Sequence, residues 1–241
     1  MAAILLTDPF PQPLSYHEFA DHNLFLGLVH AGDVLSNLAF IFVGGLGLWY
    51  LSASSKCFSS FMDSRERWAY WCLFLGVFLT GFGSSWYHLD PDNYSLVWDR
   101  LPMSLGFMAV FSAVIAERVK ISFGVTLLAP LIVLGLASVL WWIWTEDRGH
   151  GDLRWYLLVQ FYPMLTMSLM LLLLPTPYTH GSHYWGLLVC YMVAKVTEIF
   201  DHQIFEFTHE VISGHSLKHL LAAGGVAWIL RMLWLRRPLQ R

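Results

Sequence analysis

Residues 122–144 read SFGVTLLAPLIVLGLASVLWWIW and contain no charged side chain. A bilayer core of about 30 Å is crossed by about 20 helical residues, so this stretch is long enough to span a membrane. Stretches of similar length and apolar character lie at 33–53, 68–88, 97–118, 153–175, 183–203 and 215–235. The sequence therefore predicts an all-α membrane protein, in which residues 1–241 form a single bundle of seven transmembrane helices.

The composition supports this fold class and excludes others. Apolar residues make up 56% of the chain and charged residues 13%, whereas soluble domains carry about 25% charged residues. The 12 Trp and 10 Tyr residues are typical of aromatic belts at the two membrane surfaces. A net charge of −3 argues against a nucleic-acid partner, which would need a basic surface.

The distribution of lysine and arginine predicts the orientation, because these residues are enriched in cytoplasmic loops. With the N-terminus outside and the C-terminus inside, the inner side would carry Lys56, Arg65, Arg67, Arg118, Lys120, Arg231, Arg236, Arg237 and Arg241. The outer side would carry only Arg100, Arg148, Arg154 and Lys218. The bias favours an outer N-terminus.

Three groups of polar residues lie at the ends of predicted spans, where burying an ionisable side chain is costly. Ser84 and His88 are four residues apart at the end of the second span. Asp99 opens the third span, and His215 and His219, also four apart, open the seventh. Because successive spans alternate in direction, all five side chains are expected at the same face of the membrane.

These five residues have the chemistry of a metal site. Residues four apart on a helix have Cβ atoms about 5–6 Å apart, so His215 and His219 could bind one tetrahedral ion. Three histidines with an open fourth position are typical of catalytic zinc, with a carboxylate and a hydroxyl in support. Histidines in this pattern could also bind haem, and Ser84 could instead bend its helix beside an interfacial His88.

The ordered set Ser84-x-x-x-His88, Asp99 and His215-x-x-x-His219 resembles the pattern of the alkaline ceramidase family. That family belongs to the CREST superfamily of seven-helix membrane proteins. Its members cleave the amide bond of ceramides and release a fatty acid and a sphingoid base.

Two flanking segments extend this resemblance. Residues 31–40 read AGDVLSNLAF and residues 214–223 read GHSLKHLLAA, and both are similar to the corresponding family segments. The similarity runs from about residue 18 to about residue 235. The compact loops look like those of bacterial members of the family.

The resemblance implies a function and a set of residues. His88, His215 and His219 would bind zinc, and Asp99 and Ser84 would contact the attacking water or the substrate carbonyl. Position 216 is serine, so the glutamate base of an HExxH motif is absent and Asp99 is the nearest candidate for the base. We therefore expect an integral membrane hydrolase of linear amides, acting on ceramide or a related N-acyl lipid in sphingolipid or lipid metabolism.

The family also binds calcium near its N-terminus. The acidic residues that could supply ligands here are Glu18, Asp21 and Asp33, although their spacing differs from that of the family. The resemblance thus implies zinc as a cofactor and leaves calcium uncertain.

A cavity among the helices would hold the acyl chain, and we expect Phe82, Trp86, Met103 and Phe107 to line it. In the sixth span, Lys195 and Glu198 are three residues apart and are expected to pair, with Asp201 nearby. These charged residues either fix helix packing or bind a lipid head group.

Three other functions remain open from the sequence. The first is a zinc-containing seven-helix receptor of the progestin and adiponectin receptor type, without turnover. The second is a haem- or metal-binding membrane subunit that uses the same histidines as ligands only. The third is a transporter with a proton relay through Glu198 and Asp201, for which no inverted repeat is visible.

Overall fold

The computed structural model describes residues 4, 6–25, 27–53 and 59–239. Helices dominate this part of the chain. They are η2 (Leu14–His17), α1 (Ala31–Ser36), α2 (Leu38–Ala53), η3 (Ser64–Glu66), α4 (Arg67–Leu89), α5 (Asn93–Arg118), α6 (Ile121–Glu146), α7 (Arg154–Leu173), α8 (His183–Ile199), α9 (Asp201–Phe207) and α10 (Gly214–Leu235).

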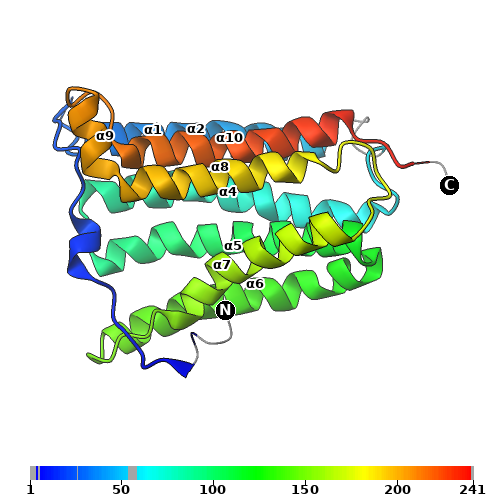
Figure 1. Cartoon of the computed structure of the whole chain (residues 1–241), viewed down its shortest axis with the longest axis horizontal. Coiled ribbons are helices and arrows are strands. Elements are labelled where there is room, and N and C mark those ends of the chain that lie inside the picture. Colours follow the sequence, from blue (N-terminus) through cyan, green and yellow to red (C-terminus); the bar gives the residue numbers. More distant parts are fainter. Residues whose placement is uncertain (1–3, 5, 26, 54–58, 240–241) are drawn as a thin grey trace.

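The long helices lie side by side along the long dimension of the molecule (Figure 1). Helix α5 packs against α4, α6 and α7, and α10 packs against α8 and α2. Contacts of α2 with α4, and of α7 with α8, close a ring of six helices, with α6 packed outside it against α5 and α7. The ring surrounds the interior space that is described below.

Five helical segments are long and apolar enough to cross a membrane: 31–53, 64–89, 93–118, 121–146 and 154–173. They correspond to the first five predicted spans, although a short break at Asn37 separates α1 from α2 within the first. The predicted sixth span is interrupted at Phe200, which lies between α8 and α9. Helix α8 has only 17 residues and contains Lys195 and Glu198, and α10 begins with the polar sequence GHSLKH; neither is among these five segments.

The outer surface of the bundle is apolar. On α6, Val133 and Leu134 are 64% and 61% exposed, and Phe42 and Trp49 of α2 are exposed as well. A surface that is apolar over whole helices is expected where the surrounding solvent is lipid.

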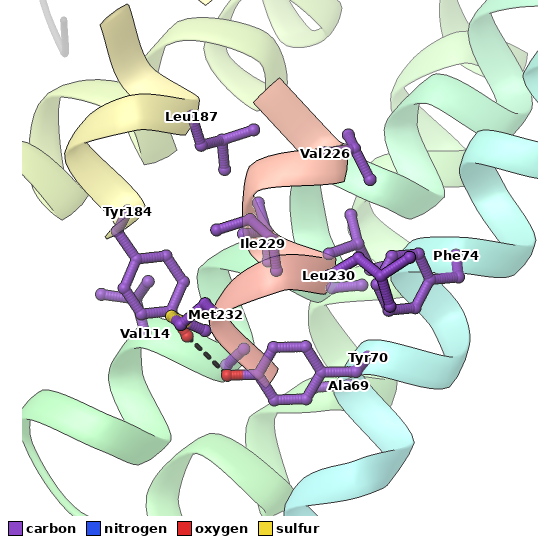
Figure 2. Packing of buried hydrophobic residues seen from close by; sticks show 14 of the residues in the cluster. Ala69, Tyr70, Phe74, Val114, Tyr184, Leu187, Val226, Ile229, Leu230 and Met232 are labelled. Carbon is purple, nitrogen blue, oxygen red and sulfur yellow. Dashed lines mark hydrogen bonds between the residues drawn. The ribbon is translucent and has the colours of Figure 1, made fainter. Parts of the chain in front are cut away.

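The interior near the C-terminal end of the bundle is packed with large side chains (Figure 2). Phe74 of α4 lies beside Leu230 of α10, and both belong to one buried cluster with Leu187 of α8. Tyr70 and Tyr184 connect their helices through a hydroxyl–hydroxyl hydrogen bond of 2.5 Å. These contacts hold α4, α8 and α10 together at the end of the bundle where α4 and α8 begin and α10 ends.

A buried arginine links several elements at this same end. The Arg236 guanidinium donates to Glu117 Oε2 at 2.9 Å, to the Tyr70 hydroxyl at 2.9 Å and to the Ser60 carbonyl at 3.0 Å. Arg236 has no exposed surface, and its partner Glu117 is also buried. The ion pair fixes the end of α10 against α4 and α5.

Helices α4 and α5 come into near backbone contact at Gly83. A Cβ atom at this position would lie 1.9 Å from the carbonyl oxygen of Trp98, so only glycine fits. Gly83 precedes Ser84, and Trp98 precedes Asp99. The close approach therefore sets the relative position of two predicted site residues.

Candidate metal centre and adjoining cavity

His88, His215 and His219 lie together at the end of the bundle opposite to Arg236. One ring nitrogen from each lies within 4.8 Å of the others, and all three residues are buried. The ring centroids are 4.7 Å apart for His88 and His215, and 4.9 Å apart for His215 and His219. Imidazole nitrogens are common metal ligands, so these three histidines could hold one metal ion between them.

His88 provides the test of whether these residues fit a metal ion. It has no exposed surface, and neither of its ring nitrogens has a hydrogen-bond partner. A buried polar atom without a partner is rare in proteins because burial removes its bonds to water. A metal ion among the three rings would bind one of these nitrogens, so the donor set fits a metal.

The second histidine of α10 is oriented by a neighbouring side chain. The Ser36 hydroxyl lies 2.8 Å from His219 Nδ1. Contacts of this kind fix the ring of a metal-binding histidine and leave its other nitrogen free for the ion. His219 therefore presents Nε2 to the centre.

His215 has a different neighbour. The Lys218 ammonium donates to His215 Nε2 at 2.9 Å and to Glu198 Oε1 at 2.9 Å. A ring nitrogen has one lone pair, so Lys218 and a metal ion cannot both use Nε2 of this histidine. Ligation through Nε2 would leave Lys218 paired with Glu198.

The N-terminal segment covers the centre. The ring of Phe19 packs edge-on against His88 and His215, with centroid distances of 4.5 and 4.6 Å. Asp201 holds this arrangement, because its two carboxylate oxygens accept from the backbone N–H of Ala20 at 2.9 Å and of His215 at 2.7 Å. Asp201 thus connects the covering segment to the start of α10.

Ser84 and Asp99 are buried next to the histidines. Ser84 and Asp99 lie on opposite sides of the α4–α5 contact at Gly83, and both side chains are buried. Together with His219, both residues line one interior cavity of about 130 Å³. The five residues predicted from sequence spacing are therefore gathered at one end of the bundle.

The cavity has a polar end and an apolar end. Leu73, Val77, Thr80 and Ser84 line it from one face of α4, a distance of about 16 Å at about 1.5 Å per residue. Its apolar part is closed by side chains of α5, α7, α8 and α10, including Met103, Phe107, Val110, Met164, Leu187 and Val226. The shape suits an amphipathic molecule with its polar group near His219.

Two of the four residues predicted to line the cavity do so. Met103 and Phe107 are in its wall. Phe82 and Trp86 are not, and they are 52% and 61% exposed on the outside of α4. At about 100° per residue, positions 82 and 86 point almost opposite to Ser84 and His88, so the prediction for them is wrong.

Charged residues concentrate at the polar end. Lys195 and Glu198 form the ion pair that their spacing predicts, and Lys218 of α10 is the second cation on Glu198. The Tyr16 hydroxyl also donates to Glu198, at 3.4 Å. All four residues line the cavity.

The three acidic residues considered for calcium are used differently. Glu18 is exposed, whereas Asp21 and Asp33 are buried. Asp21 accepts from the backbone N–H of Gly32 at 2.7 Å, and Asp33 Oδ1 accepts from the Ser213 hydroxyl at 2.6 Å. Within the described part of the chain these three do not form a ligand group, so calcium stays a prediction without structural support.

Sequence reasoning did not identify Phe19, Ser36 and Asp201 as parts of this centre. Phe19 and Ser36 are ordinary residue types with no spacing relation to the histidines. The sequence suggests packing, head-group binding or a proton relay for Asp201, and its contact with backbone N–H groups beside the histidines depends on the break at Phe200. No periodic pattern signals these contacts.

Comparison with known proteins adds no relative. No protein-family profile matches the chain, and no curated protein matches it either. The functional argument therefore depends on the residues and geometry of the site.

Proposed function

We propose that the chain is a seven-helix membrane protein, with its N-terminus outside, that hydrolyses the amide bond of ceramide or a related N-acyl lipid with zinc. Five apolar helices support the membrane location. Helices α8 and α10 lie alongside them and complete the ring (Figure 1), which supports seven spans. Lys195 and Glu198 of α8 and Lys218 and His219 of α10 face the cavity, so these charges do not oppose a transmembrane position.

One observation carries the proposal. His88 is fully buried with two unpartnered nitrogens, and it faces two more histidines at the polar end of an otherwise apolar cavity. Purely structural histidines in a membrane protein would be hydrogen-bonded, because burial without partners is costly. A metal ion next to an elongated, mostly apolar cavity accounts for both features.

The side chains around the centre can perform amide hydrolysis. A zinc ion bound there would act as a Lewis acid on the carbonyl and would lower the pKa of water to about 7. The Asp99 carboxylate accepts the proton of the attacking water and returns it to the nitrogen of the leaving amine. The Ser84 hydroxyl, which lines the cavity with Asp99, donates a hydrogen bond to the developing oxyanion.

The apolar lining of the cavity favours a lipid substrate over a water-soluble one. Its wall away from Asp99 is formed by aliphatic and aromatic side chains over about 16 Å. An acyl chain buried there would place its carbonyl near Ser84 and His219. The amine part would then lie among the charged residues of α8 and α10.

The test combines metal content with turnover. Wild type, His88→Ala, Asp99→Asn and His150→Ala are purified in mild detergent. His150→Ala is the control, because His150 is an exposed loop residue. We expect one zinc per chain in wild type, Asp99→Asn and His150→Ala, and loss of zinc in His88→Ala. Fatty-acid release from ceramide and other N-acyl lipids should occur only in wild type and His150→Ala.

Two results would contradict the proposal. Chains without metal after zinc is supplied would remove the metal centre. Zinc without release of fatty acid from any lipid amide would favour the receptor alternative. Normal turnover of Asp99→Asn would remove only the assignment of the base.

A further inference from the structure

Arg100 lies in the wall of the cavity and has no carboxylate partner. The residue is 4% exposed and follows Asp99 on α5. Its side chain forms no ion pair within 4.0 Å among the described residues. A buried guanidinium without a counter-ion is costly, especially at membrane depth, so it calls for a functional explanation.

Aromatic rings hold the guanidinium in place. Its central carbon lies 4.4 Å from the ring centroid of Trp142, 4.5 Å from that of Tyr156 and 5.5 Å from that of Tyr16. Gln12 accepts a hydrogen bond of 2.6 Å from Nη2. Stacking on aromatic faces fixes the plane of the guanidinium and leaves its edge available for hydrogen bonds.

The other terminal nitrogen is free. Arg100 Nη1 is buried and has no hydrogen-bond partner. The guanidinium is therefore oriented by Gln12 and the aromatic rings, while one of its donors remains unsatisfied in the wall of a cavity. This geometry is expected of a group that binds an acceptor on a ligand.

The charges along the cavity favour an anion. Arg100, Lys195 and Lys218 contribute three positive charges, whereas Asp99 and Glu198 contribute two negative charges. Glu198 is already shared by the two lysines. With neutral histidines the cavity therefore has an excess of one positive charge, to which a bound zinc ion would add two.

We propose that Arg100 binds the carboxylate of an anionic lipid in this cavity, and that the preferred substrates are N-acyl amino acids. This substrate class rests on the proposed amide hydrolysis, whereas the binding of a carboxylate does not. An N-acyl amino acid has one acyl chain for the apolar part of the cavity and one carboxylate beyond the amide for Arg100. A fatty acid, the product of hydrolysis, presents the same carboxylate chemistry from the other side of the amide.

The experiment measures binding with probes that cannot be hydrolysed. The first pair consists of ketone isosteres of N-lauroylglycine and N-lauroylethanolamine, in which CH₂ replaces the amide N–H. The second pair is laurate and dodecanol. Each is titrated into the full-length zinc-loaded protein in non-ionic detergent, and Kd is obtained from the quenching of tryptophan fluorescence.

The variants are Arg100→Gln, Arg100→Lys and Arg148→Gln. Arg148 is a matched control, because it also stacks on a tryptophan, with 3.9 Å to the Trp144 ring, but it is exposed. If Arg100→Gln does not fold, Arg100→Lys serves as a second variant that keeps the positive charge. Thermal melting of each variant shows which preparations are native.

We expect the acidic ketone to bind at least about tenfold more tightly than its neutral counterpart in wild type and in Arg148→Gln. The preference should disappear in Arg100→Gln and be partly kept in Arg100→Lys. Equal affinity of the two ketones in wild type, or an unchanged preference in a native Arg100→Gln variant, would overturn the N-acyl amino acid assignment.

The second pair separates the two sources of the carboxylate. A preference for laurate over dodecanol that depends on Arg100, without one for the acidic ketone, would assign Arg100 to the fatty-acid product and overturn the substrate class. Binding of the acidic ketone through Arg100, with no turnover of N-lauroylglycine or any other amide, would support the carboxylate site and contradict the proposed hydrolysis.

Discussion

Replacing Gly83 by alanine tests how the contact between α4 and α5 positions the site. The new Cβ would lie 1.9 Å from the Trp98 carbonyl oxygen, and ordinary contact begins at 3.4 Å, so the backbones must separate by about 1.5 Å. Neither atom belongs to a flexible side chain. The separation therefore moves Asp99 relative to Ser84 and His88.

The expected effects follow from this displacement. Overpacking typically costs about 1–3 kcal/mol, which lowers the melting temperature by about 2–12 °C for a chain of this size. A shift of about 1 Å in catalytic geometry can reduce the rate about 100-fold. Zinc binding should be retained, because His88 and the two histidines of α10 do not depend on α5.

Gly224→Ala is the matched control. Gly224 is also in a helix, but a Cβ there has no atom within 4 Å, so alanine should stabilise α10 by about 0.5–1 kcal/mol. Melting temperature, zinc content and lipid-amide hydrolysis are measured for both variants. A Gly83→Ala protein with unchanged melting and turnover would refute the close α4–α5 contact.

Three further variants probe buried and charged groups. Asp201→Asn leaves one of two buried N–H groups without an acceptor, so the free energy of unfolding should fall by about 1–3 kcal/mol, as measured by thermal melting. The same variant should bind zinc more weakly, as measured by competition with a chelator. Glu117 is shared by Arg236 and Arg118, so Arg236→Met leaves it one cation and should cost about 1–3 kcal/mol, whereas Glu117→Leu leaves both arginines without a carboxylate and should lower the melting temperature further. Hydrogen bonds from Arg154 lower the pKa of Asp152, so its carboxylate stabilises the fold above about pH 4 and this contribution is lost as pH falls through the lower folded pKa. Melting between pH 3 and pH 6 should therefore change less with pH in Asp152→Asn than in wild type, and equal slopes would contradict the assignment.

Hydropathy and chain direction predicted much of this arrangement. Five helices lie where the apolar stretches are, and each is long enough to cross a bilayer core of about 30 Å. The cluster of His88, His215 and His219 was also predictable, since i,i+4 spacing fixes one helix face and alternating direction fixes the end of the bundle. These two rules need no knowledge of packing.

Other features depend on contacts that have no periodic signal. The break at Phe200 places Asp201 where it accepts from the backbone N–H of His215, and the surroundings of Arg100 depend on Gln12 and Tyr16 in the N-terminal segment. Segments without regular structure carry no pattern that predicts their path. The error for Phe82 and Trp86 was different, because helical geometry alone would have excluded them.

The order of the ligands along the chain constrains how the protein is made. His88 is synthesised early, whereas His215 and His219 belong to the last helix. A ribosome-bound chain that has inserted only α2 to α8 can offer the ion a single histidine of this centre, which is too few ligands to retain it. A metal ion bound by these three histidines, as proposed above, would therefore be acquired late in biogenesis, and its retention would report that α10 has entered the bundle in the correct register.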